Sequence, residues 1–271
     1  MKIAFVSTVN LKLYNEYGKR FIFEFAEYAS SEVKLFIIFE GEVPEEILNL
    51  SDNIIVMPLV NEKFASFFKK FGTLQEAKGM RFNYFYENEK RMVKLDYDYK
   101  FNAVKFSYKP FSILQSLDYI PDDLDYLIWT DADLRCKKKF DANDLIEFMP
   151  ENEYIMSYLG RKNAYSECGF LGFNLKNERF NEYIDRVIEI YTSGEFFTLD
   201  EWHDSYIWDH IRMEFEKNYQ YKFKNLATGD AFEKEHVYIN TNLDNFFDHL
   251  KGPQRKIDGH STEDDYSKMV I

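Results

Sequence analysis

The stretch YLIWTDADLRC, Tyr126 to Cys136, runs from an apolar segment into two aspartates and then a basic residue. Its first half is aliphatic and aromatic, as expected of a strand buried in a parallel sheet. Asp131 and Asp133 stand two residues apart, so their side chains point the same way if the chain stays extended. Carboxylates placed in this way suit a hard divalent cation, Mn²⁺ or Mg²⁺, which can in turn hold a diphosphate. The alternative is that Asp131 caps a helix and Asp133 is solvated, since so short a pattern also arises by chance.

Three more strands are expected before this one. Short apolar runs rich in β-branched and aromatic residues occur at 2–8, 33–40 and 53–60, and the run that begins at Tyr126 would be the fourth strand. If the strands are parallel, their carboxyl ends meet at one edge of the sheet, which is where such folds bind ligands. The two aspartates fall at that end of their strand.

Helical patterns separate the predicted strands. Apolar residues recur at helical spacing between 16 and 30 and again between 100 and 117, where Pro110 predicts a kink or a boundary. The segment 63–97 is rich in Phe, Lys and Glu and contains no strand-like run. Alternating strands and helices predict an α/β fold with a mostly parallel sheet.

The composition is that of a folded chain without a broad basic surface. Of the 271 residues 45% are apolar, which fits one compact unit over residues 1–271. The formal net charge of −13 argues against an extensive nucleic-acid-binding face. Cys136 and Cys168 are the only cysteines, too few for a disulfide framework and wrongly spaced for a zinc site, which favours reduced thiols.

The sequence carries no sign of a membrane span or an export signal. No apolar run reaches the roughly 20 residues of a membrane-spanning helix, and the N-terminus MKIAFVSTVN lacks a signal-peptide cleavage pattern. We therefore expect a cytoplasmic protein. Its richness in Lys, Asn, Phe and Tyr favours an AT-rich source genome, either bacterial or phage-encoded and expressed in the host cytoplasm.

In this order of elements the D-x-D stretch resembles the GT-A-fold glycosyltransferases, which use nucleotide-diphosphate sugars. The resemblance implies a Rossmann-like, mostly parallel sheet with a fused acceptor-binding lobe. Residues 1–135 would form the nucleotide-sugar-binding half, and residues 136–271 the acceptor-binding half with a C-terminal metal- and diphosphate-binding segment. It further implies that Asp131 contacts the metal and the ribose, and that Asp133 coordinates the metal.

Two segments before the D-x-D resemble donor-binding elements of this family. FVSTVN, residues 5–10, looks like the first strand and the loop that receive the base and ribose, which makes Val6, Ser7 and Thr8 candidates. The alternative is an ordinary strand end. Lys105 and Lys109 lie one helical turn apart and look like the family's donor-contacting basic residues, although surface lysines often show this spacing.

The stretch ECGFLGFN, residues 167–174, is similar to the N-A-G-x-x-x-x-N segment of glycogenin-type retaining enzymes. The resemblance implies that Gly169 lets the backbone approach the donor sugar. Glu167 and Cys168 replace the family's amide and small residue, and Glu167 joins the candidate catalytic residues. A glycine-containing strand in the acceptor lobe is the structural alternative.

The stretch EWHDSYIWD, residues 201–209, looks like the W-H-D-E-S segment of the blood-group A/B and α1,3-galactosyltransferase family. Aligned from the serine, Asp204 takes the place of the family's proposed nucleophile or front-face stabiliser, and Trp202 and His203 fall on the acceptor side. The alternative is a helix N-terminus, with Asp204 near exposed backbone N–H groups and Trp202 in the core.

The stretch HLKGPQRK, residues 249–256, is similar to the H-x-x-G-x-x-K motif of glycogenin-type enzymes. The resemblance makes His249 the third metal ligand and Gly252 a close turn. Arg255 aligns with the diphosphate-binding lysine, Lys256 is its neighbour, and an arginine would serve as a forked phosphate partner. A histidine exposed in a basic loop is the alternative.

Together these resemblances imply a metal-dependent hexosyl- or pentosyltransferase that uses a UDP-sugar and retains the anomeric configuration. The acceptor is open between glycan, lipid, protein and, as in phage-type enzymes, a hydroxylated DNA base. A metal-dependent nucleotidyltransferase is an alternative, but it would be expected to carry a glycine-rich loop after its first strand, and STVNLKLYN has no glycine. A non-catalytic carbohydrate-binding module is the other, although it would not need the acidic pair, the histidine and the basic loop together.

Overall fold

The structure, a computed structural model, describes residues 1–87 and 90–267. Its centre is a seven-stranded sheet of order β10-β8-β9-β6-β1-β2-β3. Neighbouring strands run parallel except where β9 pairs antiparallel with β6 and β8. The expected α/β class with a mostly parallel sheet is therefore confirmed. The seven strands are β1 Ile3–Asn10, β2 Lys34–Glu40, β3 Ile54–Pro58, β6 Tyr126–Thr130, β8 Tyr154–Leu159, β9 Glu167–Asn174 and β10 Lys222–Asn225.

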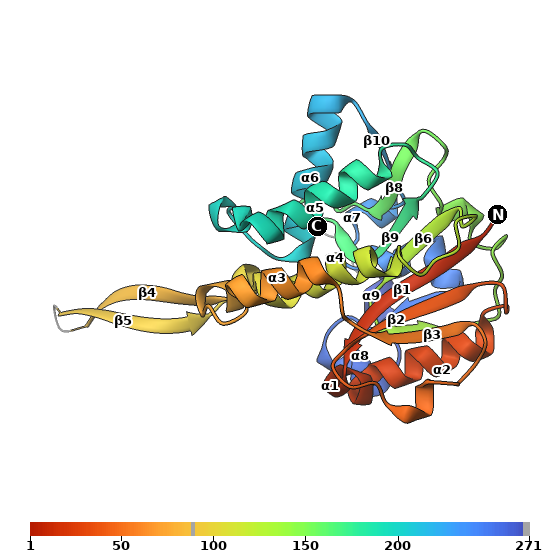
Figure 1. Cartoon of the computed structure of the whole chain (residues 1–271), viewed down its shortest axis with the longest axis horizontal. Coiled ribbons are helices and arrows are strands. Elements are labelled where there is room, and N and C mark those ends of the chain that lie inside the picture. The colour runs from red at the N-terminus through yellow and green to blue at the C-terminus, as the bar shows by residue number, and fades with distance from the viewer. Residues whose placement is uncertain (88–89, 268–271) are drawn as a thin grey trace.

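Helices cover both faces of the sheet (Figure 1). One face carries α1 and α2, joined by a π-helical turn at Tyr14–Gly18, and the other carries α3 to α6. The helices are α1 Leu11–Leu13, α2 Lys19–Tyr28, α3 Glu62–Phe71, α4 Ala103–Ser116, α5 Phe180–Ser193, α6 Asp204–Tyr219, α7 Asp230–Glu233, α8 Pro253–Asp258 and α9 Glu263–Ser267. Short 3₁₀ helices lie at Glu45–Ile47, Glu76–Lys78, Tyr99–Phe101, Ile146–Phe148, Glu195–Thr198, Tyr238–Asn240 and Asn242–Asn245.

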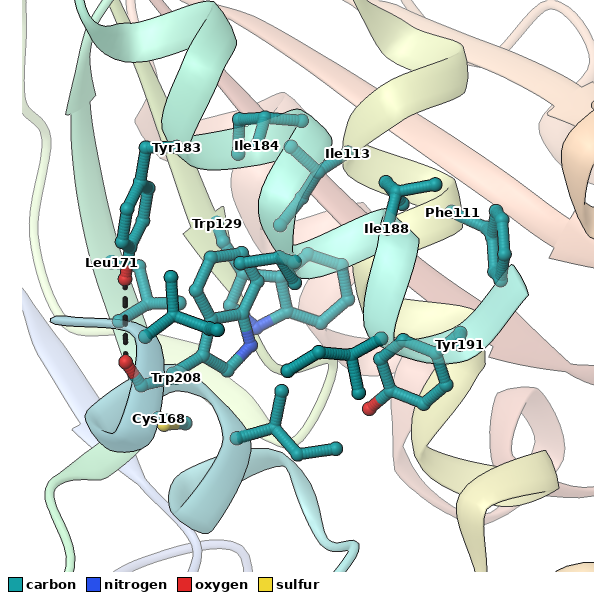
Figure 2. Close-up of a cluster of buried hydrophobic side chains, with 14 of the residues drawn as sticks. Phe111, Ile113, Trp129, Cys168, Leu171, Tyr183, Ile184, Ile188, Tyr191 and Trp208 are labelled. Atoms are coloured by element: carbon teal, nitrogen blue, oxygen red, sulfur yellow. Dashed lines mark hydrogen bonds between the residues drawn. The ribbon is translucent and has the colours of Figure 1, made fainter. Parts of the chain in front are cut away.

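Two apolar clusters make up the core, one on each face of the sheet. Strand β1 contributes to both because successive side chains point to opposite faces, with Val6 in one cluster and Phe5 in the other. The larger cluster packs α4, α5 and α6 against the sheet, and Figure 2 shows its centre around Trp129 and Trp208. There the hydroxyl of Tyr183 donates to the backbone oxygen of Trp208 at 3.3 Å. These packed helices hold the carboxyl edge of the sheet in place.

The prediction of no strand between 63 and 97 is wrong. After α3, the chain forms a hairpin of β4 Met80–Glu87 and β5 Lys90–Tyr97, which extends far from the body (Figure 1). The hairpin lies outside the main sheet, and its strands lack the long apolar run of a strand buried on both faces. Phe82 and Leu95 pair across it and remain 66% and 42% exposed.

Helix α4 continues through Pro110, so no helix boundary lies at that residue. A further small sheet pairs β7 Leu134–Cys136 with β11 Phe247–His249 in antiparallel fashion. None of the helices in the described part of the chain combines the length and the apolar character needed to cross a membrane.

Candidate functional site

The sheet topology brings the D-x-D aspartates and a distant histidine together. Strand β6 ends at Thr130, so Asp131 and Asp133 follow at the carboxyl edge of the sheet. Strand β11 pairs with β7 so that His249 lies opposite Leu134, the residue after Asp133. The backbone N–H of Leu250 also donates to the backbone oxygen of Asp133 at 3.0 Å. This pairing carries the C-terminal segment back to the end of β6.

Asp131, Asp133 and His249 form one candidate metal-ligand cluster. One ligand atom from each residue lies within 4.8 Å of the other two. Oδ1 of Asp133 makes no hydrogen bond within the described chain, although it lies 3.3 Å from Nε2 of His249, and both side chains are buried. A buried carboxylate oxygen without a hydrogen-bond partner is suited to coordinate a cation. Two carboxylates and an imidazole suit Mn²⁺, and Mg²⁺ with water filling the remaining positions.

Lysine ammonium groups face both aspartates of the cluster. Nζ of Lys256 lies 2.8 Å from Oδ2 of Asp133, and Nζ of Lys109 lies 3.2 Å from Oδ1 of Asp131. Burial works to raise the pKa of Asp133, but His249 and Lys256 hold it well below its usual range. For Asp131 burial dominates and the pKa is raised, although Lys109 offsets part of the effect.

Asp204 belongs to the same site. It is the first residue of α6, and its Oδ2 lies 2.5 Å from Nζ of Lys109, which also donates to the backbone oxygen of Cys168 at 2.7 Å. Burial alone would lower the pKa of Lys109, but Asp131 and Asp204 outweigh it and the pKa is raised. Lys109 therefore links the metal-ligand cluster to Asp204. The helix N-terminus considered as an alternative is present too, since Oδ1 of Asp204 accepts from the backbone N–H of Ser205 at 2.9 Å.

These side chains line a single cavity of about 740 Å³, which we call the donor cavity. It contains Asp131, Asp133, Asp204, Lys109 and Lys256. Its other lining residues are Thr8, Asn10, Lys12, Leu13, Tyr17, Glu40, Lys78, Asn102, Val104, Lys105, Phe106, Tyr108, Trp129 and Ala132. A cavity of this volume accommodates a ligand the size of a nucleotide sugar.

Of the donor-contacting residues predicted before the D-x-D, the structure brings Thr8, Lys105 and Lys109 to the donor cavity. Val6 is buried in the core instead, and Ser7 is fully buried between the strands. Val6 and Ser7 lie too far from the carboxyl end of β1, whereas Thr8 and Asn10 are near enough to that end to line the cavity.

The two basic residues of the C-terminal motif contact different partners. Lys256 reaches Asp133, whereas Arg255 turns to Asp265, its Nε donating to Oδ2 at 2.7 Å. Both lie on α8, where neighbouring side chains diverge by about 100°. Gly252 precedes this helix with φ at +88°, a conformation that favours glycine. Lys256, and not Arg255, therefore lines the donor cavity beside Asp133.

Glu167 lies on β9 behind the cluster and outside the lining of the donor cavity. Its Oε2 lies 2.6 Å from Nζ of Lys251 and 3.8 Å from Nη1 of Arg161. Burial works to raise the pKa of Glu167, but Lys251, His249 and Arg161 hold it well below its usual range. Such a group stays an anion behind the cluster, and its catalytic role stays a prediction.

Trp202 and His203, the predicted acceptor residues, are both buried. Trp202 packs against Phe101 and Phe196 in the core, as in the structural alternative. His203 caps α6 by accepting from the backbone N–H of Tyr206 at 3.3 Å, and its Nε2 lies 2.7 Å from Oε2 of Glu201. The aromatic rings around His203 are those of Tyr99, Phe106, Tyr165 and Tyr206.

Gly169 approaches His249 rather than the donor cavity. A Cβ atom at Gly169 would lie 2.9 Å from Cε1 of His249, closer than real contacts allow. We expect Gly169→Ala to displace the imidazole and weaken Mn²⁺ binding about tenfold, as measured by calorimetry. Gly172→Ala is the matched control on the same strand, because its Cβ would meet Ser157 instead. Equal metal affinity in both variants would contradict the role given to Gly169.

Sequence reasoning missed Asn10, Tyr17, Glu40 and Tyr108, which share the donor cavity. Oε2 of Glu40 accepts from Nδ2 of Asn10 at 3.3 Å, and Oε1 lies 3.3 Å from Oγ1 of Thr8, which donates its proton to the backbone oxygen of Ile38 at 2.7 Å. Burial raises the pKa of Glu40, and Asn10 and Thr8 offset part of the effect. The available signal in the sequence was that Glu40 is the last residue of the strand predicted at 33–40.

Comparison with known proteins gives only distant likenesses. No family model matches the sequence, and no curated protein matches it either. Among solved structures, the apo form of the glycosyltransferase GlyE of Streptococcus pneumoniae TIGR4 is similar, with 16% identity, a TM-score of 0.46 and 86% of this chain covered. The apo form of mouse xyloside xylosyltransferase 1 matches 83% of this chain and 85% of its own, with 12% identity and a TM-score of 0.49. The chain spans 46% of the length of GlyE.

Proposed function

We propose that the protein is a metal-dependent glycosyltransferase that moves a sugar from a nucleotide-diphosphate donor, a UDP-sugar, to a hydroxyl acceptor with retention of anomeric configuration. The observation that carries the proposal is that Asp131, Asp133, Lys256 and Asp204 line one cavity. His249 lies against Asp133 and completes the candidate ligand cluster. Ligands for a cation, a partner for phosphate and a separate carboxylate are the groups that this reaction needs.

The reaction breaks the bond between the anomeric carbon and a diphosphate oxygen, and the electron pair leaves with the diphosphate. A cation bound by Asp131, Asp133 and His249 would stabilise this growing negative charge. Lys256, already within 2.8 Å of Asp133, would hold the diphosphate beside the cation. The sugar gains positive charge as the bond breaks, and the carboxylate of Asp204 would stabilise it.

A new bond then forms between the anomeric carbon and the acceptor oxygen, and the hydroxyl proton leaves to a diphosphate oxygen or to Asp204. Either a covalent intermediate on Asp204 or attack on the face that the diphosphate leaves would give retention. Lys109 would hold Asp204 in place, since its ammonium contacts that carboxylate and Asp131. Glycans, lipids, proteins and hydroxylated DNA bases all offer the hydroxyl required.

Calorimetry with UDP, in the presence of Mn²⁺ and again in the presence of EDTA, tests the proposal. We expect binding that depends on the metal. UDP binding that is equal in both conditions, or absent from both, would refute it. The acceptor can then be identified by mass spectrometry of the nucleosides, glycans and proteins of cells that express the chain, with cells expressing Asp204→Ala as the control.

A further inference from the structure

The hairpin of β4 and β5 has an apolar side that the rest of the described chain does not cover. Phe82 pairs with Leu95 across the two strands, so both side chains point to one side of the ribbon. Because side chains alternate along a strand, Val93 and Tyr97 point to that side too. Val93 and Tyr97 are 54% and 55% exposed, and the other two are also exposed. We call these four residues the apolar side of the hairpin.

The opposite side of the ribbon is polar and finds its partners within the chain. Nδ2 of Asn83 donates to Oδ2 of Asp96 at 3.2 Å, and Nζ of Lys94 lies 2.6 Å from the other oxygen of that carboxylate. Nη1 of Arg81 lies 3.7 Å from Oε1 of Glu76. The hairpin is therefore amphipathic, with one side suited to water and one side suited to an apolar partner.

A two-stranded ribbon of this kind needs a layer over its apolar side. An isolated hairpin is at best marginally stable in water, and packing against a further layer is what stabilises it. Figure 1 shows the hairpin projecting away from the body, so the rest of the described chain supplies no such layer. Exposed apolar side chains gathered on one surface mark a contact with another molecule.

The distribution of charge favours a second copy of the chain as that molecule. Residues 80–97 hold four of the 34 basic residues and three of the 47 acidic ones, so the hairpin is almost neutral in a chain of net charge −13. Two copies that meet through their hairpins keep their acidic bodies apart, whereas contact between the bodies brings like charges together. The same net charge opposes approach to an anionic lipid surface.

We propose that the protein forms a two-fold symmetric dimer in which the apolar sides of two hairpins stack face to face. Each ribbon then supplies the layer that the other lacks, and both polar sides stay in water. Strands of eight residues make a ribbon about 27 Å long and about 10 Å wide. A contact of that size belongs to the smaller protein interfaces, so we expect a dissociation constant on the order of 10 µM. The dimer forms whether or not the chain transfers a sugar.

Sedimentation velocity of the full chain, at concentrations from about 1 to about 200 µM, tests the dimer. We expect the wild type to pass from monomer to dimer across this range. The double variant Phe82→Ser, Leu95→Ser should associate about tenfold more weakly or less, because it loses a cross-strand apolar pair from the contact. Met92→Ser is the matched control, since Met92 is 41% exposed on the polar side of β5, and it should dimerise as the wild type does.

A charge swap at Val93 separates the contact from the folding of the hairpin. Val93 lies near the middle of β5, so a two-fold axis through the ribbon brings its two copies together. Val93→Lys and Val93→Glu should each stay monomeric because like charges would meet, and an equimolar mixture of the two should dimerise.

Three results would overturn the inference. They are a wild type that stays monomeric at every concentration, association undiminished in the double variant, and a Val93 mixture that does not recover. Monomeric wild-type protein that sediments with vesicles of phosphatidylcholine and phosphatidylglycerol would assign the apolar side to a membrane instead.

Discussion

Asp204→Asn should lower the rate of sugar transfer about 10²- to 10³-fold, while the affinity for UDP and Mn²⁺ stays within a few-fold of wild type. The substitution preserves the size of the side chain and removes the charge that faces the developing positive charge of the sugar. It also leaves Lys109 with one carboxylate partner instead of two. The measurement is kcat and KM for the UDP-sugar, by transfer or by slow hydrolysis of the donor.

Asp200→Asn provides the control for this prediction. Asp200 is an exposed aspartate just before the segment 201–209 and does not line the donor cavity. Its replacement should leave kcat unaltered. If Asp204→Asn behaved in the same way, Asp204 would be only the first residue of a helix, and the catalytic role would have to be abandoned.

Asp133→Asn should weaken UDP binding in the presence of Mn²⁺ by about 100-fold or more. The reason is the loss of one of two anionic ligands from the cluster, which a neutral amide of the same shape cannot replace for a hard cation. Calorimetry with UDP at fixed Mn²⁺ measures the change. In EDTA the variant and the wild type should bind UDP equally, because Asp133 contributes to UDP binding through the cation.

An exposed aspartate serves as the comparison. Asp118 follows α4 and lies outside the donor cavity, so Asp118→Asn should bind UDP and Mn²⁺ as the wild type does. A thermal melt of each variant checks that the fold is retained. Undiminished Mn²⁺-dependent binding in Asp133→Asn would remove Asp133 from the ligand set.

Four strands of the main sheet could be predicted from continuous apolar runs. Those that became β1, β2 and β6 are buried on both faces, whereas β3 at the sheet edge is partly buried. No strand was predicted at β8, and β9 was expected only as an alternative, although both are largely buried. The hairpin of β4 and β5 could not be found in this way, since it is covered on neither face and its apolar residues are interrupted.

Local sequence anticipated the candidate site in part. Asp131, Asp133 and His249 could be proposed from their motifs, but the contact of Lys256 with Asp133 depends on where α8 begins and which way it faces. Glu40 stands far from every motif in sequence. Only the order of strands in the sheet, which no local pattern specifies, brings it to the same cavity.

The lysines of the donor cavity have a consequence for folding. Asp131 and Asp204 already face Lys109, and Asp133 already faces Lys256, so the chain itself opposes the charge of its buried carboxylates. A zinc finger, by contrast, folds only when its ion is bound. We therefore expect this chain to fold without an ion, so that EDTA would leave the protein folded.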